Sequence, residues 1–399
     1  MKRHTDFNKL WVGQTISLLG SAVTMLALPS VAILALGAKP FQVGLLESAQ
    51  FLAFPLLALP AGVWVDRLPR RPVMILADVG RALALGSVPL AWMLHDLNLL
   101  QLYVVALAVG VLTVFFDVAY QSYLPALIER RHLIEGNAKL EISRSASQIA
   151  GNGLGGALIQ ALGAPLSMLV DAMSFVASVI SLAAIRAIET PAGKGLGKSD
   201  PFWAQLRAGM TIVFANPTLR SIAACTATSN LGNAMIGAVY LIFAYKSLHV
   251  APAIVGGILA FGNLGVVGAF SAGALARRFG LGRTLALCSL LFGVGELVPV
   301  LAVWRLPVAF LLLGQLLLSF ANPVYNVNQV SLRQAITPDE LQGRMNATMR
   351  SIVWGTLPVG GVIGGALGNA IGVVPTIVVA GIIASSAALF IRFGQVYRL

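Results

Sequence analysis

Apolar runs of about 20 residues recur along this chain and constrain its fold more than any other feature. A helix of about 20 apolar residues crosses a hydrocarbon layer of about 30 Å, and lipid offers the backbone no other hydrogen-bond partner. Charged residues make up only 11% of the sequence, against about 25% in soluble proteins. The sequence therefore predicts an all-α membrane protein with about twelve transmembrane helices, at residues 9–36, 41–64, 73–94, 99–121, 143–163, 166–187, 219–245, 252–275, 283–303, 307–330, 346–371 and 374–392.

Basic residues gather in alternate loops. Counted from the N-terminus, nearly all Lys and Arg lie on the first side of the membrane, and only Lys39, Lys246 and Arg305 lie in loops on the other side. By the positive-inside rule both termini are cytoplasmic. The net charge of +12 therefore indicates topology, and we expect no nucleic-acid partner. We expect a multi-pass protein of the plasma membrane, specifically of the bacterial inner membrane.

The second half of the chain repeats the first. Ser122 aligns with Ser331, and Gly155 aligns with Gly364. A copied unit with an even number of helices keeps its orientation, which gives two bundles related by a pseudo-twofold axis along the membrane normal. The predicted organisation is an N-terminal six-helix bundle, a polar cytoplasmic linker and a C-terminal six-helix bundle, at residues 1–187, 188–218 and 219–399 respectively.

Polar side chains repeat at helical spacing, and the stripes on the first and fourth spans match those on the seventh and tenth. Polar groups in hydrocarbon are costly unless they meet water or a partner. The repetition favours a cavity between the halves, with hydrogen bonding between packed helices as the alternative. The cavity-lining candidates are Gln14, Ser17, Ser21, Thr24, Thr226, Asn230, Asn233, Asn322 and Asn326.

Glycines spaced four residues apart mark the fifth and eleventh spans. Small residues at this spacing let helix backbones approach closely. We therefore expect Gly151, Gly155, Gly360 and Gly364 to act in helix packing. A sliding or rocking interface is the functional alternative.

Ionisable groups inside spans are functional candidates by default. Asp78 and Arg81 lie three residues apart on one helix, so we expect them to pair. The remaining acids are candidates for proton coupling: Glu47, Asp117, Asp171 and Glu296. The four histidines are scattered over loops on both sides, which predicts no metal site and no enzyme chemistry.

The loop after the second span reads GVWVDRLPRR over residues 62–71, and a degenerate copy, GALARRFG, occupies residues 273–280. The first loop resembles the G-x-x-x-D-R-x-x-R-R/K signature of the major facilitator superfamily. The runs LWVGQ at 10–14 and DVAYQSYLP at 117–125 resemble the drug-exporter branch of that superfamily, which contains macrolide-efflux and enterobactin-exporter proteins.

This resemblance implies a gating motif at the cytoplasmic side, formed by Gly62, Asp66, Arg67, Arg70 and Arg71. An anion is favoured at a helix N-terminus. We therefore expect Asp66 to face the start of the eleventh span, which the sequence places near residues 345–346.

The combined interpretation is a secondary active efflux transporter, a proton-coupled antiporter of amphiphilic drug-like molecules that works by alternating access. The alternatives are a siderophore or lipid exporter and an uptake carrier, with a membrane-bound enzyme or receptor as the most distant. We expect no cofactor, a proton gradient as the energy source, a small amphiphilic substrate and the lipid bilayer as partners, and a monomer. The lack of an obvious fixed-charge pair in the cavity favours neutral or cationic amphiphiles.

Overall fold

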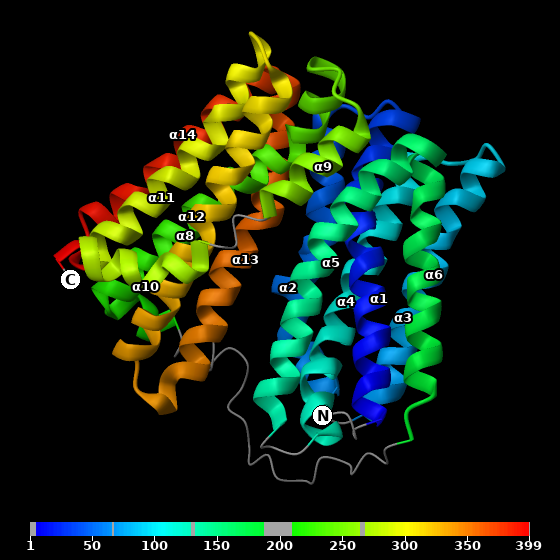
Figure 1. The fold of residues 1–399 in the computed structure, drawn as a ribbon, viewed down its shortest axis with the longest axis horizontal. Coiled ribbons are helices and arrows are strands. Elements are labelled where there is room, and N and C mark those ends of the chain that lie inside the picture. The colour runs from blue at the N-terminus through cyan, green and yellow to red at the C-terminus, as the bar shows by residue number, and fades with distance from the viewer. Residues whose placement is uncertain (1–4, 66–67, 129–131, 187–209, 264–267, 399) are drawn as a thin grey trace. The chain divides into compact units, whose positions relative to one another are not determined.

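The structure is a computed structural model that describes residues 5–65, 68–128, 132–186, 210–263 and 268–398. These residues fold into helices joined by turns, without a strand among them (Figure 1). They form two compact units. Unit 1 comprises Met1–Ala38, Ala49–Gly197 and Ala251–Ala260, and unit 2 comprises Lys39–Ser48, Lys198–Val250 and Phe261–Leu399.

Unit 1 is built on five complete helices: α1 (Thr5–Ser30), α3 (Arg70–Met93), α4 (Leu99–Leu127), α5 (Leu133–Leu162) and α6 (Ala164–Ala183). It also contains α2 (Pro40–Val65) from Ala49 onward and α9 (Pro252–Gly262) up to Ala260. Phe7, Met74, Phe116 and Tyr123 are fully buried in one cluster of its core. The core thus joins the N-terminal helix to α3 and α4.

Unit 2 is built on α8 (Pro217–Ile242), α10 (Gly268–Phe279), α11 (Leu281–Leu297), α12 (Pro307–Ile336), α13 (Asp339–Ala370) and α14 (Val373–Arg392). The first residues of α2 and the end of α9 complete it. Two 3₁₀ turns, η5 (Val298–Val303) and η6 (Gln395–Arg398), follow α11 and α14. Ile222, Leu285, Met345 and Ile391 are fully buried together, so α8, α11, α13 and α14 share one core.

Helix lengths agree with membrane spans. Within the described residues, nine helices are long and apolar enough to cross a bilayer, and Pro252–Gly262 is a shorter apolar helix. The helices α2 and α5, of 26 and 30 residues, occupy the second and fifth predicted spans. The chain is therefore an all-α, multi-pass membrane protein.

Several helices extend beyond their predicted spans. Helix α5 begins at Leu133, before the predicted residue 143, and α13 begins at Asp339, before the predicted residue 346. Hydropathy marks only the part of a helix that lipid can surround, so it misses polar turns at the ends. The apolar span itself begins at Arg344, close to the predicted residues 345–346. The helix begins earlier, so the positive end of its dipole lies at Asp339 instead of near Met345.

The duplication is visible in the backbone. Helix α1 ends in a π-helical turn, η1 (Val31–Ala35), and α8 ends in a π-helical turn of equal length, η3 (Phe243–Ser247). The amide of Ala38 donates to Ala32 O at 2.8 Å, and Val250 donates to Ala244 O at 2.9 Å. Both copies of the repeat therefore end their first helix in the same way.

The two halves also share a tight turn before their last helix. Gly163 precedes α6 with φ 84°, and Gly372 precedes α14 with φ 90°. Only glycine adopts these angles without steric cost. Gly163 and Gly372 have the same separation in the sequence as Gly155 and Gly364, so equivalent glycines of the repeat let the chain reverse direction.

Candidate functional site

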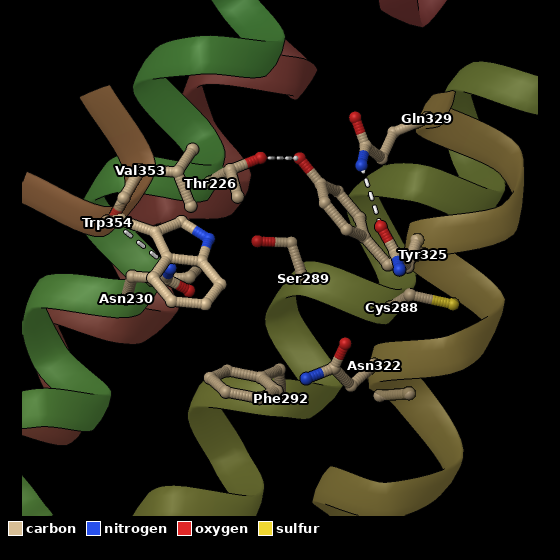
Figure 2. Close-up of a pocket in the computed structure, with 13 residues that line it drawn as sticks. Thr226, Asn230, Cys288, Ser289, Phe292, Asn322, Tyr325, Gln329, Val353 and Trp354 are labelled. Atoms are coloured by element: carbon tan, nitrogen blue, oxygen red, sulfur yellow. Dashed lines mark hydrogen bonds between the residues drawn. The ribbon is translucent and has the colours of Figure 1, made fainter. Parts of the chain in front are cut away.

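A pocket of about 410 Å³ lies within unit 2 (Figure 2). Four helices form its walls. Their pocket-facing residues are Thr226, Ser229 and Asn230 from α8, Cys288, Ser289 and Phe292 from α11, Ala321, Asn322, Tyr325, Asn326 and Gln329 from α12, and Val353 and Trp354 from α13. None of these side chains carries a fixed charge.

The polar side chains are organised by hydrogen bonds across the pocket wall. Thr226 Oγ1 lies 2.9 Å from the hydroxyl of Tyr325, and Gln329 Nε2 donates to Asn326 Oδ1 at 2.8 Å. Asn230 Nδ2 donates to the carbonyl of Val353 at 3.4 Å. Figure 2 shows these contacts as dashed lines. These hydrogen bonds hold the amides of Asn230, Asn326 and Gln329 in place, so this part of the wall is preorganised.

Some hydrogen-bonding capacity of the pocket is left for a ligand. The Oε1 atom of Gln329 is buried and has no partner, and Asn322 makes no hydrogen bond with the residues that the structure describes. The aromatic rings of Phe292 and Trp354 supply apolar area beside these amides. A ligand that combines apolar surface with neutral donors and acceptors matches this wall.

The seventh-span and tenth-span stripes converge on this pocket. Thr226, Asn230, Asn322 and Asn326 all line it. Asn233 points elsewhere, because its Nδ2 donates to Glu296 Oε1 at 2.6 Å. The structure therefore brings four of the five second-half candidates into one pocket and pairs the fifth with a predicted proton-coupling acid.

The stripe on the first span packs within unit 1. Gln14, Ser17 and Thr24 are buried, and Ser21 Oγ lies 3.5 Å from Asp171 Oδ1 on α6. In this structure Ser21 acts between packed helices, which was the alternative interpretation. A cavity-lining role for the first-span stripe stays a prediction.

The remaining proton-coupling candidates, Glu47, Asp117 and Glu296, lie in different environments. Glu47, on the part of α2 in unit 2, is half-buried, and its Oε2 lies 2.9 Å from the point that a Cβ on Gly237 would occupy. Asp117 is half-buried on α4, where it acts electrostatically on Tyr120 together with Arg144 and Glu141. Glu296 is 2% exposed. A proton-coupling role stays a prediction for each of them.

The predicted packing glycines lie at close helix approaches. A Cβ on Gly151 would be 2.5 Å from Ala22 Cβ, and one on Gly155 would be 3.3 Å from Val23 Cα. In unit 2, a Cβ on Gly360 would be 2.7 Å from Leu231 O. Gly364 meets the backbone of Met235 even more closely. Helices α1 with α5, and α8 with α13, thus touch backbone to backbone.

Comparison with known proteins identifies the family. The model of the Major Facilitator Superfamily matches residues 10–229, more than half of the chain. The chain belongs to the major facilitator superfamily. It is a membrane transporter and not an enzyme.

The chain resembles curated relatives and solved structures over most of its length. The multidrug efflux pump Tap of Mycolicibacterium fortuitum is 25% identical, over 86% of this chain and 84% of its own length. The enterobactin exporter EntS of Salmonella choleraesuis (strain SC-B67) is 25% identical, over 87% of this chain and 81% of its own length. A bacterial homologue of the iron transporter ferroportin has the same fold, with a TM-score of 0.74 and 17% identity. The match covers 96% of this chain and 98% of the homologue.

The superfamily's signature loop falls partly outside the described residues. Asp66 and Arg67 lie outside them, and the side-chain surroundings of Gly62 are likewise not described. Arg71 Nε donates to Leu182 O at 2.8 Å, and its Nη2 donates to Ala183 O at 2.5 Å. A cation is favoured at the C-terminal end of a helix, so Arg71 caps α6.

The sequence did not predict the pocket residues that α11 and α13 contribute. Cys288, Phe292 and Trp354 sit in apolar runs, where nothing in the local pattern distinguishes a pocket wall from a lipid-facing surface. The run of small and polar residues 226–230 was the usable signal on α8. A matching signal is absent from the α11 sequence around Phe292.

Proposed function

We propose that this chain is a proton-coupled exporter of neutral amphiphilic small molecules that works by alternating access. We further propose that it acts as a monomer in the bacterial inner membrane with both termini cytoplasmic. The observation that carries the proposal is the uncharged, amide-rich and aromatic pocket of unit 2. The two relatives of known direction, Tap and EntS, are named as exporters, which supports outward transport.

The charges near the pocket favour neutral substrates over cations. Arg333 acts electrostatically on Tyr325, and the Arg350 guanidinium carbon lies 5.5 Å from the centre of the Trp354 ring. Both residues are cationic, so a second positive charge entering the pocket meets repulsion. Amide groups, by contrast, bind hydroxyl and carbonyl groups without a charge.

A proton gradient supplies enough energy for this task. Moving one charge through 100 mV yields about 2.3 kcal/mol, whereas a tenfold concentration ratio costs about 1.4 kcal/mol. One proton therefore sustains a substrate gradient of roughly fiftyfold.

Transport into proteoliposomes tests the proposal. Vesicles with an acidic lumen are mixed with radiolabelled chloramphenicol, a neutral molecule with hydroxyl and amide groups, or with ethidium, a cation. We expect chloramphenicol to accumulate and ethidium to accumulate less. Equal accumulation with and without the pH gradient, or in protein-free vesicles, would contradict the proposal.

The two cysteines provide a direct test of the pocket. Cys288 lines it and is 6% exposed, whereas Cys225 is 0% exposed and its Sγ lies 3.3 Å from Ser289 Oγ. We expect N-ethylmaleimide to label Cys288 and chloramphenicol to slow that labelling, as measured by mass spectrometry. Cys288→Ser removes the label and Cys225→Ser keeps it. Labelling that chloramphenicol never slows would place the substrate elsewhere.

The signature aspartate gives a second expected result. Asp66→Asn removes a charge from the loop but adds no bulk. A surface contact is worth about 1 kcal/mol or less, and losing it shifts a two-state equilibrium by up to about fivefold. We therefore expect transport to fall severalfold while the amount of protein in the membrane, measured by immunoblot, stays unchanged. Undiminished efflux by this variant would argue against a gate at Asp66.

A further inference from the structure

The core of unit 1 contains a charged cluster that the substrate pocket does not use. It consists of Asp78 and Arg81 on α3 and Asp171 on α6. These residues are 0%, 5% and 1% exposed. Charged side chains are almost never this buried unless they are paired, so the cluster needs an explanation.

Arg81 is fixed in place by three neighbours. It forms an ion pair with Asp78, as the sequence predicted. Its guanidinium carbon lies 4.4 Å from the centre of the Phe116 ring on α4 and 4.2 Å from the centre of the Phe175 ring on α6. A guanidinium between two aromatic faces is stabilised as a cation. The guanidinium of the cluster is therefore held between two aromatic rings and a carboxylate.

Asp171 is surrounded by hydroxyl groups. Ser174 Oγ lies 2.9 Å from its Oδ1, and Ser21 Oγ of α1 lies 3.5 Å from the same atom. Helix α1 approaches this closely because Gly20 has no side chain: a Cβ there would lie 2.6 Å from Asp171 Oδ1. A hydroxyl can donate to a carboxylate or accept from a carboxyl O–H, so both protonation states of Asp171 can be hydrogen-bonded.

The groups that face Asp171 come from two neighbouring helices. Helix α1 presents the hydroxyls of Ser21 and Thr24, and α3 presents Arg81 with its partner Asp78. Among the described titratable groups, Arg81 is the one whose charge acts on Asp171. Phe175, against which Arg81 stacks, lies one turn after Asp171 on α6. Arg81 therefore approaches the same stretch of α6 that carries Asp171.

The charges of the cluster do not balance. Two ionised carboxylates and one guanidinium leave one net negative charge in a buried core, and such a charge is strongly unfavourable. Moreover, Asp78 Oδ2 is buried and makes no hydrogen bond of normal geometry, although the hydroxyl of Ser178 on α6 faces this carboxylate. One bound proton restores neutrality.

We propose that this cluster binds the proton that drives transport, and that Asp171 is the group that takes it up and releases it. This inference rests on the proposed proton-coupled function. Asp78 stays paired with Arg81, whereas Asp171 has only hydroxyl partners that tolerate either state. The O–H bond forms on a carboxylate oxygen with a proton taken from water on one side, and breaks when water on the other side accepts that proton. No electrons are exchanged.

The test uses the full-length protein in proteoliposomes with an acidic lumen and a pH-sensitive dye. Asp171→Asn keeps the shape of the side chain and its hydrogen-bond acceptor but cannot exchange a proton. We expect chloramphenicol accumulation to fall to the level measured without a pH gradient, and the proton counterflow to disappear. Downhill chloramphenicol exchange should persist, which shows that the variant is folded. Asp96→Asn, in the exposed turn after α3, is the matched control and should behave as wild type.

A double variant separates proton binding from packing. Ser21→Ala with Ser174→Ala removes donors that stabilise the ionised carboxylate, so Asp171 keeps its proton to higher pH. We expect the pH profile of transport to move to higher pH. A purely structural role would lower transport at every pH without moving the profile.

The outcomes distinguish the two proposals. Wild-type protein that moves chloramphenicol without protons would overturn both. Proton-coupled transport that survives Asp171→Asn would overturn the cluster and leave the exporter intact. Coupling that is lost instead in Glu296→Gln would move the proton site to the pair of Glu296 and Asn233 in unit 2.

Discussion

Gly364→Val is expected to destabilise unit 2 strongly. A Cβ at this position would lie 2.5 Å from Met235 Cα and 2.7 Å from Met235 C. These are backbone atoms, so α13 has to move away from α8. Overpacking of this kind costs about 3 kcal/mol, which corresponds to a fall of roughly 6–12 °C in Tm for a unit of about 200 residues. Size-exclusion chromatography after heating, with fluorescence detection, measures the change.

Gly355 provides the matched control on the same helix. A Cβ there would meet nothing within 4 Å, and alanine is about 1 kcal/mol better than glycine within a helix. Gly355→Ala should therefore keep or slightly raise Tm. Equal effects of the two substitutions would show that backbone contact between α13 and α8 is not what limits stability.

Asn322→Leu is expected to cause the largest loss of substrate affinity. Its amide lines the pocket without a partner among the described residues, and leucine has similar size but no hydrogen-bonding group. Asn322 is exposed to the pocket, so losing its hydrogen bond to the substrate costs about 0.5–1.5 kcal/mol. This cost corresponds to a roughly 2–12-fold rise in KM for chloramphenicol. Initial rates in proteoliposomes measure this value.

A negative charge at the same position should change the transport of the two probes in opposite directions. Asn322→Asp adds one negative charge to an otherwise uncharged wall, so ethidium transport should rise while chloramphenicol transport falls. Asn369→Leu, at the exposed end of α13, should change neither. If both Asn322 variants transport chloramphenicol with an unchanged KM, the pocket of unit 2 is not the substrate site.

The local sequence pattern was sufficient to predict the membrane spans and part of the pocket. Apolar length located α1, α3 and α14 within a few residues, because lipid acts on each helix separately. Thr226, Asn230, Asn322 and Asn326 were found because polar residues recur at helical spacing on helices related by the duplication. The pairing of Asp78 with Arg81 also followed from their separation along one helix.

The sequence alone determined the class of protein: a duplicated chain of apolar helices with basic residues on one side and the superfamily's signature loop. Only the tertiary structure decided which helix faces meet. It brought Phe292 and Trp354 to the amide pocket, and it placed Arg81 between Phe116 and Phe175 near Asp171. The physical reason is that hydropathy and periodicity act along one helix, whereas these contacts depend on glycine-mediated approach between helices distant in the chain.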